Sequence, residues 1–123
     1  MLLNLSNHPY EKWDNAQKED AILVYDIVVD LPFPEVDPMA DTAKVDELAT
    51  DYFLQCEAKL RASKDKNRIN AVHISGEPCF LFQFVTLAKS QGVTCICSTT
   101  RRLVTNEGNI KTSFFQFVQF RKY

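Results

Sequence analysis

Three short polar segments contain the side chains best suited to binding a phosphate. Ser6-Asn7-His8 offers a hydroxyl, an amide and an imidazole, and Ser75-Gly76-Glu77 offers a hydroxyl and a carboxylate beside a glycine. Ser98-Thr99-Thr100-Arg101-Arg102 offers three hydroxyls and two guanidinium groups. Hydroxyl and guanidinium groups donate hydrogen bonds to phosphate oxygens, and an imidazole can move a proton near neutral pH.

The arginine pair is the most suggestive part of these segments. Guanidinium forks bind phosphate through two parallel hydrogen bonds, and the hydroxyls of Thr99 and Thr100 can add donors. If a strand continues through this segment, Arg101 and Arg102 point to opposite faces. One arginine can then serve a pocket while the other faces solvent or a partner. The competing interpretation is a solvated hairpin edge, which charged side chains protect from aggregation.

Ser75, Gly76 and Glu77 precede an expected helix. Amide groups at a helix N-terminus suit a phosphate, and a glycine lets a ligand approach the backbone closely. The alternative is an ordinary helix cap and turn, which is the more common use of serine and glycine. For His8, a role as general acid or base, or as a phosphate donor, competes with a histidine that only occupies a turn.

Other familiar site patterns do not occur. The chain has neither a G-x-G-x-x-G nor a P-loop sequence, so we expect no nucleotide cofactor. Cys95-Ile-Cys97 lacks the C-x-x-C spacing of a zinc site, and we expect no metal. His73 lies inside an expected strand, where a core position is favoured over a catalytic one. The sequence alone does not indicate a catalytic arrangement of Ser, His and Asp.

The elements that must position these residues alternate between strands and helices. Strands are expected at residues 1–5, 25–31, 69–74 and 93–98, with helices starting at Asp14, near Asp41 or Thr42, and at Cys79. Residues 101–105 and 110–120 are expected to pair as a hairpin. This order predicts an α/β fold: one small Rossmann-like, doubly wound, mostly parallel sheet with a C-terminal antiparallel hairpin, in a single domain over residues 1–123. In such sheets ligands bind beyond the carboxyl ends of the strands, where the polar segments would meet.

Two apolar segments carry further expectations. The nearly continuous apolar run at residues 25–31 is typical of a parallel strand covered on both faces. The expected helix at residues 79–90 has few outward polar positions. A helix that is apolar all round is buried on more than one side, and in a domain this small we expect one covering side to be another subunit.

Composition narrows the class of protein. The 123 residues carry a net charge of −2 and are 46% hydrophobic. This balance does not favour general nucleic-acid binding, and a duplex DNA partner is not expected. The N-terminus lacks the basic region of a signal peptide, and no apolar run approaches the ~20 residues that cross a bilayer. A cytoplasmic protein without a membrane partner is therefore expected.

Four stretches resemble a family of small bacterial proteins encoded with CRISPR loci. These stretches are LLNLSNHP, VVDLPFPEVDP, SGEPCF and the closing STTRRLV…FFQFVQFRKY. The family has a single Rossmann-like domain related to the CRISPR-associated Rossmann fold, or CARF. The resemblance runs along the whole chain, although Pro78 departs from the family pattern after Gly76-Glu77.

The resemblance implies a homodimer whose two-fold axis joins two pockets for a cyclic oligoadenylate, the second messenger of one class of antiviral defence. Some members of the wider group cleave this messenger and are called ring nucleases, while the present sequence leaves open whether the chain cleaves or only binds. Carried over by motif, the site residues that the resemblance implies are Asn7, His8, Gly76, Glu77, Thr99, Thr100 and Arg101.

Position in the fold adds Ser75 and Arg102 to the expected ligand-binding residues, with His8 and Arg101 as the catalytic candidates. Cleavage would need no metal, because the 2′-hydroxyl of the ligand itself would attack the neighbouring phosphate. The alternative function is a non-catalytic interaction module that uses the Phe-rich last strand and the apolar third helix.

Overall fold

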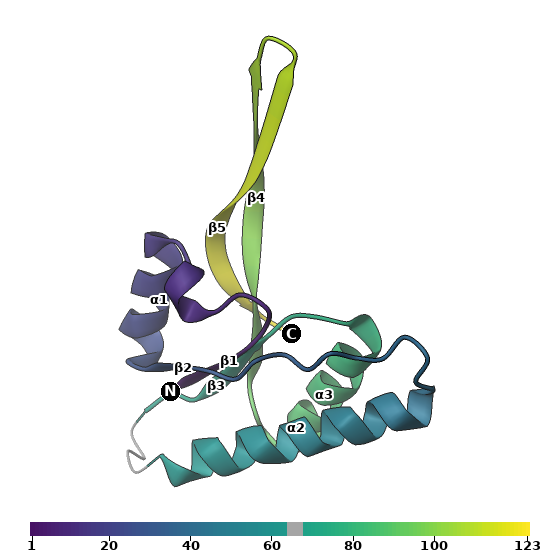
Figure 1. Cartoon of the computed structure of the whole chain (residues 1–123). Helices are drawn as coiled ribbons and strands as arrows, with labels where there is room; N and C mark the ends of the chain where they lie inside the picture. The colour runs from purple at the N-terminus through teal and green to yellow at the C-terminus, as the bar shows by residue number, and fades with distance from the viewer. Residues whose placement is uncertain (64–67) are drawn as a thin grey trace.

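The computed structural model describes residues 1–63 and 68–123 as strands and helices that alternate along most of the chain (Figure 1). The elements are β1 (Leu2–Leu5), a 3-10 turn η1 (Tyr10–Lys12), α1 (Asn15–Tyr25), β2 (Val28–Asp30), α2 (Thr42–Ala62), β3 (Ala71–Ile74), α3 (Pro78–Ser90), β4 (Cys95–Glu107) and β5 (Ile110–Lys122).

The strands form one sheet in the order β2-β1-β3-β4-β5. The pairings of β1 with β2, of β1 with β3 and of β3 with β4 are parallel, whereas β4 and β5 pair antiparallel. The expected fold class is therefore confirmed: a mixed α/β fold with a mostly parallel sheet and a C-terminal antiparallel hairpin.

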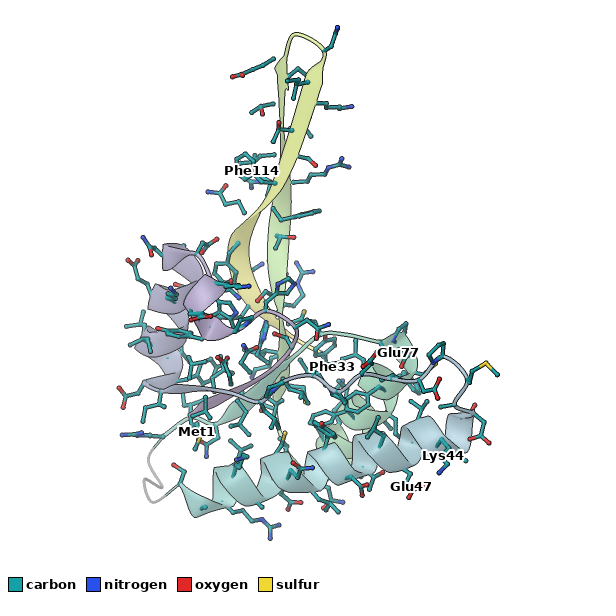
Figure 2. The ribbon with its side chains drawn as sticks, viewed as in Figure 1. Met1, Phe33, Lys44, Glu47, Glu77 and Phe114 are labelled. Carbon is teal, nitrogen blue, oxygen red and sulfur yellow. The ribbon has the colours of Figure 1, made fainter. Side chains whose placement is uncertain are left out.

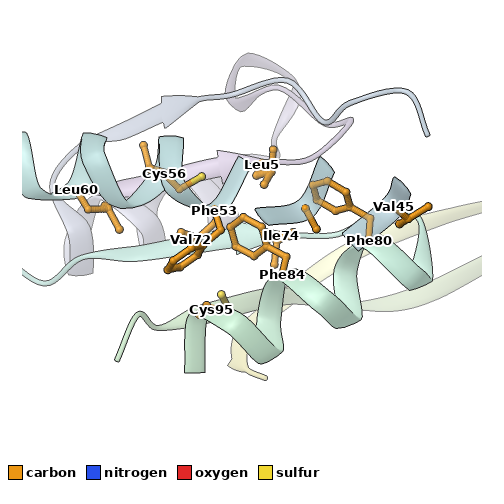
Figure 3. Packing of buried hydrophobic residues seen from close by; sticks show 13 residues of the cluster. Leu5, Val45, Phe53, Cys56, Leu60, Val72, Ile74, Phe80, Phe84 and Cys95 are labelled. Carbon is orange, nitrogen blue, oxygen red and sulfur yellow. The ribbon is translucent and has the colours of Figure 1, made fainter. Parts of the chain in front are cut away.

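The two faces of the sheet are covered differently. Helices α2 and α3 pack on one face, where the rings of Phe53, Phe80 and Phe84 are almost fully buried (Figure 3). Helix α1 lies over the other face, where Trp13 and Tyr25 pack against Leu2 and other apolar residues. Because side chains alternate along a strand, neighbouring residues of β1 belong to opposite faces. The sheet is thus the middle of three layers.

Local sequence signals explain where the helices begin. The carboxylate of Asp14 accepts a hydrogen bond from the backbone N–H of Gln17, and Asp41 does the same for Lys44. Pro78 is the first residue of α3, where its missing N–H costs nothing. Among the described residues, no helix combines the length and apolar character needed to cross a membrane.

The expected strand at residues 25–31 is shorter and more exposed than the sequence indicates. Tyr25 is the last residue of α1, and Asp26 follows with a positive φ of 68°. Strand β2 covers Val28–Asp30 and pairs with β1 alone, so it is an edge strand, and Val29 is 37% exposed. The expectation of a strand covered on both faces was wrong, because an apolar run does not reveal a strand's place in the sheet.

Strand β4 does not end at Ser98, as expected, but continues to Glu107. The register with β5 shifts between Thr99 and Thr100, which marks a β-bulge. Beyond this bulge the two strands form an arm that projects away from the rest of the chain (Figure 1). Residues 99 and 100, which were expected between two strands, therefore lie within one continuous strand.

Candidate functional site

A buried polar network lies on the α1 face of the sheet. Asn4 and His73 are register partners in β1 and β3, and each is less than 5% exposed. The Nδ1 atom of His73 lies 2.9 Å from Oδ1 of Asn4, and its Nε2 atom lies 2.7 Å from Oγ of Ser98. Three neighbouring strands thus contribute one side chain each to a connected chain of hydrogen bonds.

The direction of every hydrogen bond in this network follows from the Asn4 side chain. Its Nδ2 atom lies 2.8 Å from the backbone carbonyl oxygen of His8, which can only accept. The Oδ1 atom of Asn4 must then accept from His73, so Nδ1 of His73 carries the proton. In a neutral imidazole the Nε2 atom is then unprotonated and accepts the hydroxyl proton of Ser98. The hydroxyl oxygen in turn accepts from Nε2 of Gln17 at 3.0 Å.

The surroundings of the imidazole keep it neutral. The Trp13 ring packs edge-to-face on His73 at 5.1 Å between centroids, and the Phe120 ring lies at 5.8 Å. Burial, with a smaller contribution from His8, lowers the pKa of His73 from 6.5 to about 4. At neutral pH the imidazole is therefore uncharged, as the hydrogen-bond directions require.

A cavity of about 510 Å³ opens onto this network, and its volume lies within the usual range of small-molecule pockets. We call it the main cavity. It lies between η1, α1, the ends of the parallel strands and the base of the arm. The lining residues are His8, Lys12, Trp13, Asp14, Gln17, His73, Ser75, Ser98, Thr100, Phe115 and Phe117.

The walls of the main cavity are tied together by hydrogen bonds. The carbonyl oxygen of His8 accepts from the side chains of Asn4 and Trp13, which fixes the loop after β1. The carboxylate of Asp30 accepts from Asn4 and from the backbone N–H of Tyr10. These contacts hold the loop backbone in place while leaving the His8 side chain exposed.

Asp14 joins helix α1 to the arm. One carboxylate oxygen caps α1, and the other accepts from the backbone N–H of Phe117, 3.2 Å away. Phe117 lies next to the bulge that reorients the arm. Asp14 therefore fixes the arm relative to the main cavity.

Several residues expected from the sequence meet in the main cavity, namely His8, Ser75 and Thr100. Arg102 pairs with Phe115, and Thr100 pairs with Phe117, so alternation places Arg102 on the cavity side of the arm. Arg101 lies on the opposite side of the arm, away from the main cavity. The Thr99 hydroxyl donates to the backbone carbonyl of Gln119 across the arm.

The other expected residues lie elsewhere. Asn7 and Glu77 line a separate hollow of about 310 Å³, together with Phe33 and its neighbours. Figure 2 labels Phe33 and Glu77. A Cβ atom added to Gly76 would lie 2.4 Å from the Phe33 ring, so the close approach at this glycine is made by Phe33. The Glu77 carboxylate accepts from the backbone N–H of Phe80 at 2.7 Å and occupies the N-terminus of α3.

These hydrogen bonds change the electrostatics of the α3 N-terminus. The backbone N–H groups of Phe80 and Cys79 hold the pKa of the Glu77 carboxyl below its usual range. The site at which a phosphate was expected is therefore already filled by a carboxylate from the chain itself. Gly76 and Glu77 act together as a packing contact and a helix cap.

Asn4, Gln17 and His73 are residues of the candidate site that sequence reasoning missed, and Ser98 was placed in a candidate segment without a role of its own. A signal for them was present in the spacing of polar residues by two. Asn4 and Ser6, His73 and Ser75, and Ser98 and Thr100 each share one face of a strand. What the spacing cannot supply is the register that places His73 beside Asn4.

Within residues 1–63 and 68–123, no three His, Cys, Asp or Glu side chains gather closely enough to hold a metal ion. The fold and the cavity define an α/β protein with a cavity of mixed polar and aromatic lining at the carboxyl ends of a mostly parallel sheet. The chain belongs to the Uncharacterized protein MJ1673 family, whose model matches residues 1–121. Comparison with curated proteins and with solved structures gave no match.

We predict that His73 stays unprotonated down to about pH 4 in the folded protein. Its folded pKa lies below the unfolded value of 6.5, so protonation favours unfolding. This contribution to stability is complete above pH 6.5 and is lost as the pH falls toward 4. The loss amounts to about 3 kcal/mol over that window.

The measurement is an NMR titration of the imidazole signals, with urea unfolding from pH 7 to pH 4. The variant His73→Gln serves as the control, and its free energy of unfolding should fall less over the same range. An imidazole pKa of 6 or higher for His73 would contradict the prediction.

Gly76→Ala is predicted to lower the free energy of unfolding by about 1–3 kcal/mol, because the new methyl group overlaps the Phe33 ring. The same substitution should cost less in a Phe33→Leu background, where the ring is absent. Urea unfolding of the four proteins gives the coupling between the two positions. Equal costs in both backgrounds would show that Phe33 is not the obstacle.

Proposed function

We propose that this protein binds a cyclic oligoadenylate at the carboxyl ends of the sheet and acts as a CRISPR-associated accessory protein. The observation that carries the proposal is the convergence of His8, Ser75 and Thr100 on one cavity. These residues come from three segments that are distant in sequence. The sequence resemblance given above supplies the chemical identity of the ligand.

The cavity offers groups for both parts of a nucleotide. Lys12 lines the main cavity, and Arg102 lies on the same side of the arm, so both can attract phosphate. The Phe115 ring also lines the cavity and is 68% exposed, which leaves a face for a base to stack on. Basic side chains and an exposed aromatic ring are the usual means of holding single-stranded nucleotides.

The same proposal includes cleavage of the ligand, which the experiments below separate from binding. A 2′-hydroxyl of the ring can attack the neighbouring phosphate if the site holds the two groups in line. Of the two catalytic candidates from the sequence, His8 lines the main cavity, whereas Arg101 points away from it. Arg102 is the better placed arginine for contact with a phosphate.

A second candidate function is an interaction module that uses the arm. Phe114 is 50% exposed and Ile110 is 69% exposed, far from the packed core (Figure 2). The arm also carries Arg101, Arg102 and Lys111 against one acidic residue, Glu107. Exposed apolar side chains with this charge suit a protein partner that has an acidic surface.

We predict that the protein binds cyclic tetra-adenylate or cyclic hexa-adenylate in the presence of EDTA. Lys12→Ala and Arg102→Ala should each weaken binding about tenfold, because each removes a charge-assisted hydrogen bond worth about 1.4 kcal/mol or more. Arg101→Ala is the matched control, and its affinity should stay within about twofold of the parent protein. Isothermal titration calorimetry measures the affinities.

Product analysis of the same mixtures separates binding from cleavage. Cleavage that is lost in His8→Ala would support a ring nuclease, whereas binding without product would indicate a sensor. Failure to bind either ring would overturn the proposal. Unchanged affinity in Phe115→Ala would instead favour a protein partner for the aromatic residues of the arm.

A homodimer belongs to the same proposal, and α3 is its candidate contact. Phe80, Phe84 and Ala88 are buried inside the chain, while Phe82 on the outer face of α3 is 75% exposed. An exposed aromatic ring on a helix suits an interface in which both copies use the same surface.

Phe82→Asp is therefore predicted to convert a dimer into a monomer, because a carboxylate would replace an aromatic ring at the contact. Leu23→Asp on α1 is the matched control, since Leu23 is 84% exposed on a different helix. Size-exclusion chromatography with light scattering gives the mass of each protein. A parent protein that is monomeric at every concentration would contradict the prediction.

A further inference from the structure

The hydrogen bonds that end at Ser98 give the main cavity a hydroxyl group unlike its other hydroxyls. Ser98 is bonded to an unprotonated imidazole nitrogen at 2.7 Å, and the far side of that imidazole is held by Asn4. Both ring nitrogens of His73 are thereby occupied, so Ser75 and Thr100 in the same cavity have no such partner.

We propose that Ser98, His73 and Asn4 form a catalytic triad in which the Ser98 hydroxyl is the nucleophile for a phosphate ester. Ser98 and His73 line the cavity and would contact the substrate, whereas Asn4 positions the imidazole. The order of groups is the one that activates a nucleophilic serine: hydroxyl, unprotonated imidazole nitrogen, protonated imidazole nitrogen, fixed acceptor. This inference goes beyond the proposed function and does not require the ester to be a cyclic oligoadenylate.

The network is built to hold this tautomer. Asn4 donates to the carbonyl oxygen of His8 and to Asp30, so its oxygen has no freedom to turn away from His73. The hydroxyl of Ser6 also donates to that oxygen at 2.8 Å. The edge-on Trp13 ring fixes the plane of the imidazole from one side. In the described part of the chain, every buried side-chain nitrogen or oxygen has a hydrogen-bond partner.

The reaction would proceed in two balanced steps. In the first, the Ser98 oxygen forms a bond to phosphorus, the bond from phosphorus to the leaving oxygen breaks, and the serine proton passes through Nε2 of His73 to that oxygen. In the second, water gives a proton to Nε2 and attacks phosphorus, and the serine oxygen leaves and takes the proton back. The net change is hydrolysis of one phosphate ester bond.

The charge of Lys12 favours a phosphate over a neutral ester. Lys12 lines the cavity and can attract the phosphate charge. The Gln17 amide donates to the Ser98 oxygen from 3.0 Å and holds that oxygen in place for either kind of ester.

The test is covalent labelling of the full chain with a fluorophosphonate, followed by mass spectrometry of peptides. One adduct on Ser98 is expected, with fluoride as the leaving group. Ser90→Ala, whose hydroxyl lies on α3 outside the main cavity, should be labelled at the parent rate, and Ser98→Ala should not be labelled. In His73→Gln the rate should fall at least 100-fold, because the general base is lost.

The position of the adduct on the unsubstituted protein decides the proposal even if His73→Gln does not fold. An unlabelled Ser98 in the folded protein, or labelling that persists in Ser98→Ala, would overturn it. Turnover of bis(p-nitrophenyl) phosphate should follow the same order among the variants. A labelled Ser98 in a protein that binds no cyclic oligoadenylate would support the triad and remove the proposed ligand.

Discussion

The side-chain amide of Asn4 is the constraint on which the polar half of the structure depends. It joins β1 to Asp30 at the end of β2, to His73 in β3 and to the loop that carries His8. The carbonyl oxygen of His8 and the carboxylate of Asp30 can only accept, and they fix the orientation of the amide. Reversing the amide would turn its oxygen toward these two acceptors, which is costly for groups withdrawn from water.

The hydrogen bonds of the Asn4 amide act on the α1 face of the sheet and hardly affect the face covered by α2 and α3. On the face covered by α2 and α3, large rings such as Phe53 and Phe84 pack with aliphatic side chains, and burial of apolar area provides most of the stabilisation. On the α1 face, the apolar cluster around Trp13 gives way to the polar network near the strand ends. The face covered by α2 and α3 can therefore support the fold while the α1 face holds a site.

The sequence was sufficient for the order of elements and for the helix starts, because Asp14, Asp41 and Pro78 act within one helical turn. The sequence was insufficient for features that depend on pairing between distant segments. Thr99 and Thr100 were expected between two strands, yet pairing with Gln119 and Phe117 makes them part of one continuous strand. His73 was expected in the core and is buried, but its role depends on Asn4 and Ser98, which the register of three strands brings near. Local sequence patterns therefore did not show that His73 belongs to the candidate site.

The loop after β1 shows why adjacent residues in one motif can serve different places. Its backbone is fixed by the contacts of the His8 carbonyl oxygen, and His8 lines the main cavity while Asn7 lines the hollow beside Phe33. The hollow is bordered by Glu77, whose carboxylate already meets the amide groups of the α3 N-terminus. Because that positive end of the helix dipole is compensated within the chain, attraction for an anion must come from side chains on the other side of the loop. Lys12 lines the main cavity together with Ser98, whose hydroxyl is bonded to an imidazole, and Arg102 lies on the same side of the arm as Thr100.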